Sequence, residues 1–506
     1  MKNLILSSIC LALVIVLVAF RTAKPLAPVD VTELTISKIH LAYKMGQFTS
    51  EQLVAAYLDR ISQFDKQINS ITTINPVALS IAKELDEEYK RTKVLRPLHG
   101  IPIIVKDNIN TKGLPTTAGA ISLQNFAPDT DAFIIEKLVK AGAIIIAKSN
   151  MAEWAFSPRN SFSSLHGTTL NPYNLEYTPA GSSGGTAASV AANFGAIGLG
   201  TDTGNSIRGP SSHCSLVGFR TTIGLISRAG IIPLSINYDV VGPMCRTVED
   251  AVKVLEIMVG YDPSDPVTKQ SEGKTHGNYI QFLQKQGLMG ARIGVLRELS
   301  DDNPDPEIEA LFKKALVDLK FLGADIIDTL TIPDFSDLSK GQKCLTFRTD
   351  IESYLTTYVK NDTVRTIDDI IRIGTKSKFA ADRLNTNKTA ENRCLDAYTD
   401  QRRIAFRKAI EDHMDKLKLD AIVYPTWNNK PAEIISSDKD YKGDNSQIIA
   451  PHTGQPAFTV PMGFSKGNLP AGIQFLGRMY AEPTLIRLAY SYEQGTKHRV
   501  SPLIKK

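Results

Sequence analysis

Cysteine, clustered charge and long apolar runs are all scarce in this chain of 506 residues. Only five cysteines are present and none forms a C-x-x-C pair, which argues against a disulfide scaffold and a zinc ribbon. Lys plus Arg is 58 against 53 for Asp plus Glu, so the formal charge of +5 gives no support to nucleic-acid binding. The composition, 42% hydrophobic and 22% charged, is that of a globular protein with a large core.

Several catalytic and metal-binding motifs are also missing. The chain has no P-loop, no H-E-x-x-H, no EF-hand loop and no well-placed dinucleotide-binding G-x-G-x-x-G. The eight histidines show no short metal-ligand spacing. We therefore expect neither a metal site nor a bound cofactor.

One apolar run, residues 4–20, bears on where the protein is located. Lys2 precedes the run, and Arg21 and Lys24 follow it. Its length lies between that of a signal-peptide core and that of a minimal membrane span, and no small-x-small cleavage site follows. We assign residues 1–27 to a signal peptide or an N-terminal membrane anchor, and expect an exported (periplasmic or secreted) or membrane-anchored protein. Without Lys2, Arg21 and Lys24 the formal net charge of the chain falls from +5 to +2.

The rest of the chain alternates predicted helices with predicted strands. The clearest helix follows Thr49, which forms a capping box with Gln52, and apolar residues recur at helical spacing up to Ile61. Further helices are predicted within 131–142, 184–194 and 306–322, and strands at 101–105, 143–147, 196–200, 292–296 and 421–423. This alternation is typical of an α/β protein with a mostly parallel or mixed sheet, and 261–278 is expected to be a surface connector.

A glycine-rich segment, Gly181-Ser182-Ser183-Gly184-Gly185, contains the Gly-x-Ser-x-Gly spacing of a nucleophile elbow. That motif needs a buried strand before it. The preceding residues 171–179 contain two prolines and two asparagines, which make a poor central strand. A loop that caps a helix beginning near Thr186 is the simpler interpretation of this segment taken alone.

Two other segments contain residues suited to nucleophilic catalysis. Residues 200–210 follow the predicted strand 196–200, at the end of a strand where α/β sheets place ligands. Their small side chains let backbone N–H groups point into one space beside Ser206, as in an oxyanion hole. Lys106 ends the apolar strand 101–105, and an apolar setting lowers the pKa of a lysine so that it can act as a base.

Together these segments resemble the amidase signature family, and the similarity extends from about Leu34 to the C-terminus. The segments that carry it are PLHGIPIIVKDNI (97–109), AGAIIIAKSNMAEWA (141–155), PAGSSGGTAASVAANFGAIGLGTDTGNSIRGPSSHC (179–214), RAGIIPLSINYDVVGPMCRTVEDA (228–251) and TGQPAFTVPMGF (453–464). The resemblance implies one large α/β domain over residues 28–506, with a mixed central sheet flanked by helices, after the N-terminal hydrophobic segment.

The resemblance also implies a Ser206–Ser182–Lys106 triad. In this family neutral lysine accepts a proton from the bridging serine, here Ser182, which accepts one from the nucleophile, here Ser206. Gly181–Ser182 would be the family's cis peptide bond. The implied oxyanion donors are the backbone N–H groups of Thr203, Gly204, Asn205 and Ser206.

Further residues are expected to support the site. Ser183 resembles a supporting hydroxyl, and Asp202 and Arg208 resemble partners that shape the loop. Trp154 and Phe156 are candidate walls of the substrate pocket, with ordinary core aromatics as the alternative.

One position departs from the family pattern. The family usually has glycine just before the nucleophile, where this chain has Asn205. Asparagine tolerates unusual φ better than most residues, so the oxyanion turn can survive. Its amide is expected either to narrow the pocket or to add a donor.

The resulting hypothesis is a stand-alone amidase. It would hydrolyse a small-molecule or peptide amide, rather than the peptide backbone, to an acid plus ammonia or an amine. The alternatives are an esterase or carbamate hydrolase with the same acyl-enzyme chemistry, and an amidotransferase A-type subunit, against which the hydrophobic N-terminus argues. We expect no nucleic-acid partner, and membrane association only through residues 4–20. A homodimer is expected on the family resemblance alone.

Overall fold

The structure is a computed structural model that describes residues 29–342, 344–360, 363–390 and 394–504. The predicted targeting segment, residues 4–20, lies outside the described residues. In the part of the chain that is described, no helix combines the length and the apolar character needed to cross a membrane. From Val31 onward the chain forms one compact unit.

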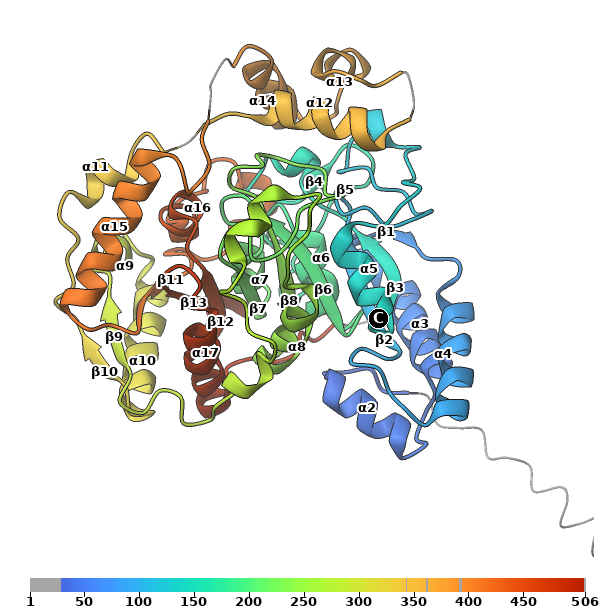
Figure 1. Cartoon of the computed structure of the whole chain (residues 1–506), viewed down its shortest axis with the longest axis horizontal. Coiled ribbons are helices and arrows are strands. Elements are labelled where there is room, and N and C mark those ends of the chain that lie inside the picture. Colours follow the sequence, from blue (N-terminus) through green and yellow to red (C-terminus); the bar gives the residue numbers. More distant parts are fainter. Residues whose placement is uncertain (1–28, 343, 361–362, 391–393, 505–506) are drawn as a thin grey trace, which may run out of the picture. The chain divides into compact units, whose positions relative to one another are not determined.

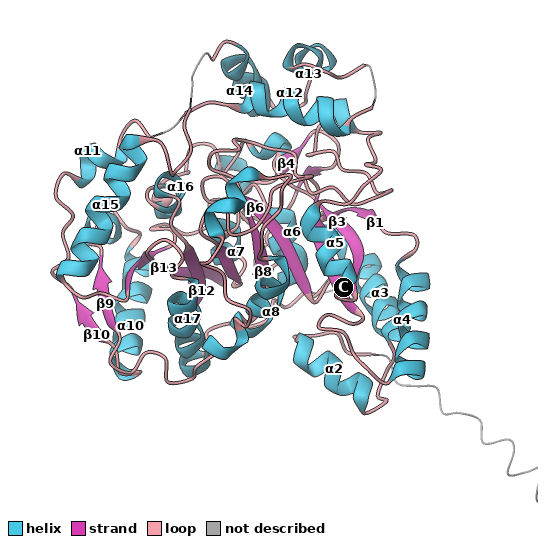
Figure 2. Cartoon of the chain, viewed as in Figure 1, coloured by secondary structure: helices cyan, strands magenta, loops and turns pink. Residues whose placement is uncertain are grey.

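A mixed sheet of eleven strands is the centre of the fold (Figures 1 and 2). In spatial order the strands are β1 (Ile71–Ile74), β3 (Ala143–Ser149), β2 (Ile101–Lys106), β6 (Ile197–Asp202), β8 (Val240–Cys245), β7 (Val217–Arg220), β12 (Ala457–Ser465), β13 (Leu469–Leu476), β11 (Ala421–Pro425), β9 (Arg292–Val295) and β10 (Asp325–Ile327). β3, β2 and β6 pair in parallel, as do β11, β9 and β10, and antiparallel pairs connect the two groups. Helices flank this sheet, so the predicted α/β fold with a mixed central sheet is confirmed.

The helices that flank the sheet include all four that were predicted. The longer ones are α2 (Ile36–Lys44), α3 (Ser50–Ile68), α4 (Ala78–Thr92), α5 (Phe133–Lys140), α6 (Gly184–Ala191), α8 (Val248–Met258), α10 (Pro306–Phe321), α15 (Gln401–Lys416) and α17 (Glu482–Thr496). Shorter ones are α7 (Arg208–His213), α9 (Arg297–Ser300), α11 (Phe335–Ser339) and α16 (Ala450–Thr453). The capping box of Thr49 and Gln52 is present at the start of α3, and Asp305 caps α10. The expected connector, 261–278, holds one short 3-10 helix, Pro266–Ser271.

Strand pairing brings two predicted functional segments together. β2 and β6 are parallel neighbours, with Val105 opposite Leu199, and every residue of both strands is buried. Because parallel strands end at the same edge of a sheet, Lys106 at the end of β2 lies next to the residues that follow β6. The helix α6 and the loop before it lead into β6, which adds Ser182 to the same edge.

Three helices that periodicity did not predict lie over this edge of the sheet (Figure 1). They are α12 (Phe347–Tyr358), α13 (Ile367–Ile373) and α14 (Lys378–Lys388), and they contact one another. We call these three helices the cap. A two-stranded sheet, β4 (Phe162–Ser163) with β5 (Gly167–Thr168), is also separate from the main sheet.

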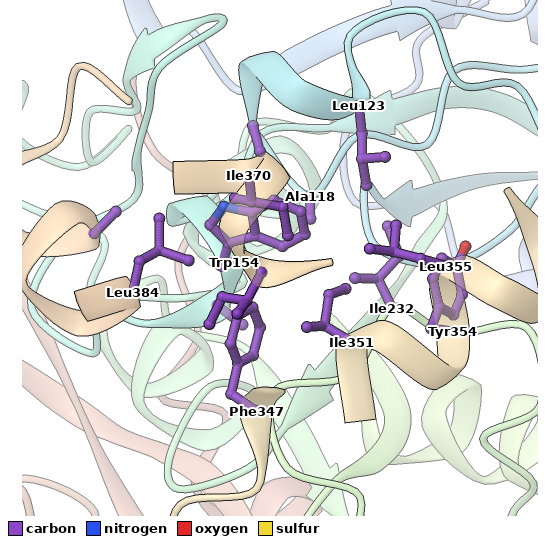
Figure 3. Close-up of a cluster of buried hydrophobic side chains, with 14 of the residues drawn as sticks. Ala118, Leu123, Trp154, Ile232, Phe347, Ile351, Tyr354, Leu355, Ile370 and Leu384 are labelled. Atoms are coloured by element: carbon purple, nitrogen blue, oxygen red, sulfur yellow. The ribbon is translucent and has the colours of Figure 1, made fainter. Parts of the chain in front are cut away.

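An apolar cluster attaches the cap to the body of the protein (Figure 3). Its members include Ala118, Leu123, Trp154 and Ile232 from the body and Phe347, Ile351, Tyr354, Leu355, Ile370 and Leu384 from the cap. The rings of Trp154 and Phe347 meet edge to face, with centroids 5.8 Å apart. Each fully buried large apolar side chain contributes about 1.5–3 kcal/mol, so the cap is held mainly by hydrophobic burial.

A disulfide also restrains the cap. Cys344, just before α12, is bonded to Cys394, which follows α14, at a sequence separation of 50. The sparse cysteine pattern did not predict this bond, because no short motif links the two positions. Cys214 and Cys245 are buried and free.

Candidate active site

Lys106 is wholly buried at the end of β2. Its Nζ lies 2.7 Å from Ser182 Oγ and 2.8 Å from Thr201 Oγ1, so two hydroxyls fix the amine. Asn108 in turn donates to Thr201 Oγ1 at 3.1 Å. Burial lowers the pKa of Lys106 to about 7, although Asp202 and Asp239 act to raise it. A substantial share of Lys106 is therefore neutral near physiological pH.

Ser182 occupies the glycine-rich loop that precedes α6. The Gly181–Ser182 peptide bond is cis, as the family resemblance implied. A Cβ on Gly181 would lie 2.4 Å from Ser157 O, so the close approach of the two backbones requires glycine here. The preceding residues 171–179 make only isolated bridges rather than a strand, which fits a capping loop and not a nucleophile elbow.

Ser206 lies in the loop between β6 and α7, with 4% of its surface exposed. Its Oγ is 3.4 Å from Asn205 Oδ1, a weak contact, and no hydrogen bond joins it to Ser182 within the described residues. The backbone N–H groups of Thr203, Gly204, Asn205 and Ser206 likewise have no hydrogen-bond acceptor in the described part of the chain. All four residues line a cavity, so these donors are available to a bound group.

A buried ionic network holds this loop from below. Arg208 Nε lies 3.1 Å from Asp202 Oδ2, and Arg220 Nη1 lies 2.9 Å from Asp202 Oδ1, with all three side chains inaccessible to solvent. Arg208 also donates to Gly204 O at 2.7 Å, which fixes the turn directly. Burial alone would raise the pKa of Asp202, but the two arginines hold it at about 2. Asp202 and Arg208 thus lie where expected, while Arg220 had no sequence signal.

Asp239 is a second residue that the sequence analysis missed. It accepts a hydrogen bond from Thr203 Oγ1 in the loop before Ser206, and from the backbone N–H groups of Leu234 and Ser235 at 2.9 and 3.0 Å. Burial raises the pKa of Asp239 to about 6. A carboxylate that binds both the loop 203–206 and a cavity wall could have been found only from the three-dimensional contact.

The cavity above Ser206 has a volume of about 340 Å³. Phe156 lines it, together with Leu345 and Phe347 at the start of the cap. Trp154 does not line the cavity but lies in the apolar cluster beneath the cap, 1% exposed. Of the two candidate wall residues, the structure therefore places only Phe156 against the cavity.

Among the described residues, no three His, Cys, Asp or Glu side chains gather in an arrangement that could hold a metal ion.

Asn205 and Ser183 complete the immediate surroundings. Asn205 lines the cavity with 2% of its surface exposed. A Cβ added to Gly209 would lie 2.9 Å from Asn205 Nδ2. The side chain therefore fills space that Gly209 leaves open. Ser183 Oγ donates to Thr201 O at 3.2 Å, which ties the loop of Ser182 to β6.

Comparison with known proteins agrees with this fold. A family model described as Amidase matches residues 52–486. A probable amidase of Arabidopsis thaliana is 35% identical over 94% of this chain and 92% of its own length. The A-type subunit of glutamyl-tRNA(Gln) amidotransferase from Alkaliphilus metalliredigens is 34% identical over 92% of this chain and 96% of its own. The X-ray structure of native peptide amidase from Stenotrophomonas maltophilia superposes with a TM-score of 0.83 at 33% identity, covering 94% and 99% of the two chains.

The fold and the site thus define a hydrolase built on a mixed α/β sheet. The match over nearly the whole chain identifies it further: this chain belongs to the amidase signature family, and it is an amidase.

Proposed function

We propose that this chain hydrolyses a linear carboxylic amide to an acid plus ammonia or an amine, through an acyl-enzyme on Ser206. The observation that carries the proposal is the 2.7 Å contact between the wholly buried Lys106 Nζ and Ser182 Oγ, at the same edge of the sheet as Ser206, which lines the cavity. A serine hydroxyl needs a base to become a nucleophile, and a lysine with a pKa of about 7 can supply one.

In the proposed reaction, neutral Lys106 takes a proton from Ser182 as Ser182 takes one from Ser206. Ser206 Oγ then bonds to the amide carbon, and the carbonyl oxygen becomes an anion. The N–H groups of the loop 203–206, which have no acceptor among the described residues, are available to stabilise that anion. The relayed proton passes to the leaving nitrogen, and water then hydrolyses the ester on Ser206.

Ammonia release from short, long-chain, aryl and peptide amides tests this function. We expect turnover of at least one class by the full chain, and a loss of about a thousandfold or more with Ser206→Ala. Ser211→Ala is the matched control, because Ser211 is equally buried on α7, its Oγ has no partner among the described residues, and it does not line the cavity. Full activity of Ser206→Ala would contradict the assignment, and turnover of esters or carbamates but no amides would favour the alternative hydrolases.

A role as one component of an amidotransferase is the second candidate function. The 34% identity to the A-type subunit of glutamyl-tRNA(Gln) amidotransferase from Alkaliphilus metalliredigens favours it. The name of that relative describes one component of a larger enzyme, whereas a stand-alone amidase needs no other chain. Ammonia release by the purified chain alone supports the stand-alone function, and activity that appears only after a partner is added supports the amidotransferase role.

We also propose that residues 1–27 export the protein or anchor it in a membrane, ahead of an amidase domain over residues 28–506. The apolar run 4–20 supports this, as does the Cys344–Cys394 disulfide, since such bonds persist in oxidising compartments. Fractionation of cells that express the chain with and without residues 1–27 is the test. Recovery of both forms from the cytosol with reduced cysteines would contradict the proposal.

A further inference from the structure

Two arginines from distant parts of the sequence line the cavity that contains Ser206. Arg159 precedes β4, and Arg383 lies on the cap helix α14. The ring of Phe379 contacts both, with its centroid 5.0 Å from the guanidinium carbon of Arg159 and 5.9 Å from that of Arg383. Tyr441 supports Arg159 at 5.4 Å. Aromatic rings hold a guanidinium by its face and leave its N–H groups free to bind a planar anion.

The carboxylates nearby do not neutralise both arginines. Arg159 forms an ion pair with Asp438 at 3.2 Å, and Asp438 is largely exposed. In the described residues, Arg383 has neither an ion-pair partner nor an acceptor for its guanidinium, and its Nε is buried. Burial lowers the pKa of Arg383, and the charge of Arg159 lowers it further. An anion bound beside Arg383 would stabilise the positive charge of its guanidinium.

The remainder of the cavity lining adds no negative charge. Among the described residues that line it, none is Asp or Glu. Asp444, which is half-buried nearby, already accepts hydrogen bonds from Ser446 Oγ at 2.5 Å and Tyr441 at 3.0 Å. The other polar members, such as Asn387 and Gln447, are neutral. An anion that enters the cavity therefore meets two cations and no like charge.

We propose that Arg159 and Arg383 form a carboxylate-binding subsite, so that the amide hydrolysed at Ser206 also carries a free carboxylate. This proposal rests on the proposed amidase reaction. A guanidinium binds a carboxylate through paired N–H groups, which fix the orientation of the carboxylate as well as increasing its affinity. A cavity of about 340 Å³ suits a small acid amide, and the subsite would hold one end of it while Ser206 attacks the other.

Matched substrates test the subsite. Ammonia release is measured for monoamides of dicarboxylic acids of increasing length, each against the alkyl amide in which a methyl replaces the carboxylate. A second series compares N-acyl amino acids with N-acyl alkylamines by amine release. We expect a kcat/KM ratio of acid to neutral substrate of about 10- to 100-fold in one series, mainly through KM. Arg383→Gln should lower that ratio about tenfold, and Arg383→Lys should retain more of it.

Arg372→Gln is the control, because Arg372 is an arginine of the same cap that is 66% exposed, paired with Asp369 and absent from the cavity lining. This variant should leave the ratio unchanged, and thermal unfolding should show each variant folded. A ratio near one in both series, or a ratio that Arg383→Gln does not change, would overturn the subsite while amide turnover itself upholds the amidase reaction. No turnover of any amide, acid or neutral, would contradict the amidase reaction and the subsite with it.

Discussion

The residues beneath the cavity and the helices above it are held in place by different forces. The floor, which we define as Lys106, Ser182, Asp202, Arg208 and Arg220, contains the Lys106–Ser182 hydrogen bond of 2.7 Å and the ion pairs of Asp202 with Arg208 and Arg220 at 3.1 and 2.9 Å. None of these side chains reaches solvent. The cap is held mainly by apolar contacts and one disulfide, with a smaller number of hydrogen bonds to the body, such as those of Tyr354 to Asn110 and of the Ile236 N–H to Asp350. Polar contacts are directional and fix the position of each atom, whereas apolar contacts depend mainly on the area that they bury.

This difference suggests a division of roles. Chemistry requires atoms placed to within a fraction of an ångström, and the floor supplies that precision. Selection of the substrate depends on shape and charge, and the cap contributes Arg383 and Phe347 to the cavity wall. If the division is correct, changes in the floor should act on the rate of the chemical step, and changes in the cap should act mainly on KM.

The largest effect is expected from Lys106→Met. Methionine has a similar length and no base, so kcat/KM should fall about a thousandfold or more. Stability should stay the same or rise, because the variant no longer buries an amine. Initial rates and thermal unfolding of the same samples check both expectations.

Lys148→Met is the matched control for that variant. Lys148 is as buried as Lys106, but its Nζ lies 3.7 Å from Asp107 Oδ1 and 2.8 Å from Ile109 O rather than near a serine. Its removal leaves Asp107 without its cation, so the free energy of unfolding should drop by about 3–5 kcal/mol. If the two lysine variants lost activity and stability in parallel, Lys106 would be a structural residue and not a base.

The next effect is expected from Asp202→Asn, which should destabilise the protein by about 3–5 kcal/mol. The substitution leaves Arg208 and Arg220 buried without their shared carboxylate. Urea unfolding of the variant, followed by fluorescence, measures the change. A loss below about 1 kcal/mol would show that the ionic network is not what holds the floor.

Removal of the disulfide by Cys344→Ser with Cys394→Ser tests the cap. A bond that closes a loop of this length, at a separation of 50, contributes about 2–4 kcal/mol to stability. We expect KM to rise several-fold while kcat on a small amide stays within about twofold, since Cys344 lines the cavity and the floor is untouched. A reducing agent should reproduce the effect in the unaltered protein and do nothing to the variant. An equal fall in kcat would break the proposed division between floor and cap.

Sequence patterns predicted the floor much better than the cap. Lys106, Ser182 and Ser206 lie in short segments that carry the resemblance to the amidase signature family, and the predicted strands around them, β2 and β6, are present as parallel neighbours. The helix with its capping box at Thr49 was also found because its signals lie within a few residues. Such features depend on near neighbours in the chain, and a single sequence displays them.

The cap, and some residues of the site itself, depend on contacts that no local pattern displays. Arg220 and Asp239 reach the site only after strands β7 and β8 have paired. Arg383 and Phe379 are neighbours within α14, but they meet Arg159 only because α14 lies over the cavity. Trp154 was a candidate wall, yet it lies in the apolar cluster and, unlike Phe156, does not line the cavity. Tertiary packing decided each of these cases, and residue type alone could not.

The pH dependence of kcat/KM tests, through the smallest expected effect, whether the floor and the cap act separately. Burial lowers the pKa of Lys106 to about 7, and the amine is active as a base only when it has lost its proton. Activity on a neutral amide should therefore rise with pH, about tenfold per unit below pH 7, and level off above it. Because the buried setting of Lys106 belongs to the floor, the midpoint should be the same when Cys344 and Cys394 are replaced. A midpoint that moved with the disulfide would mean that the cap controls access of water to the base, and that the two regions act as one.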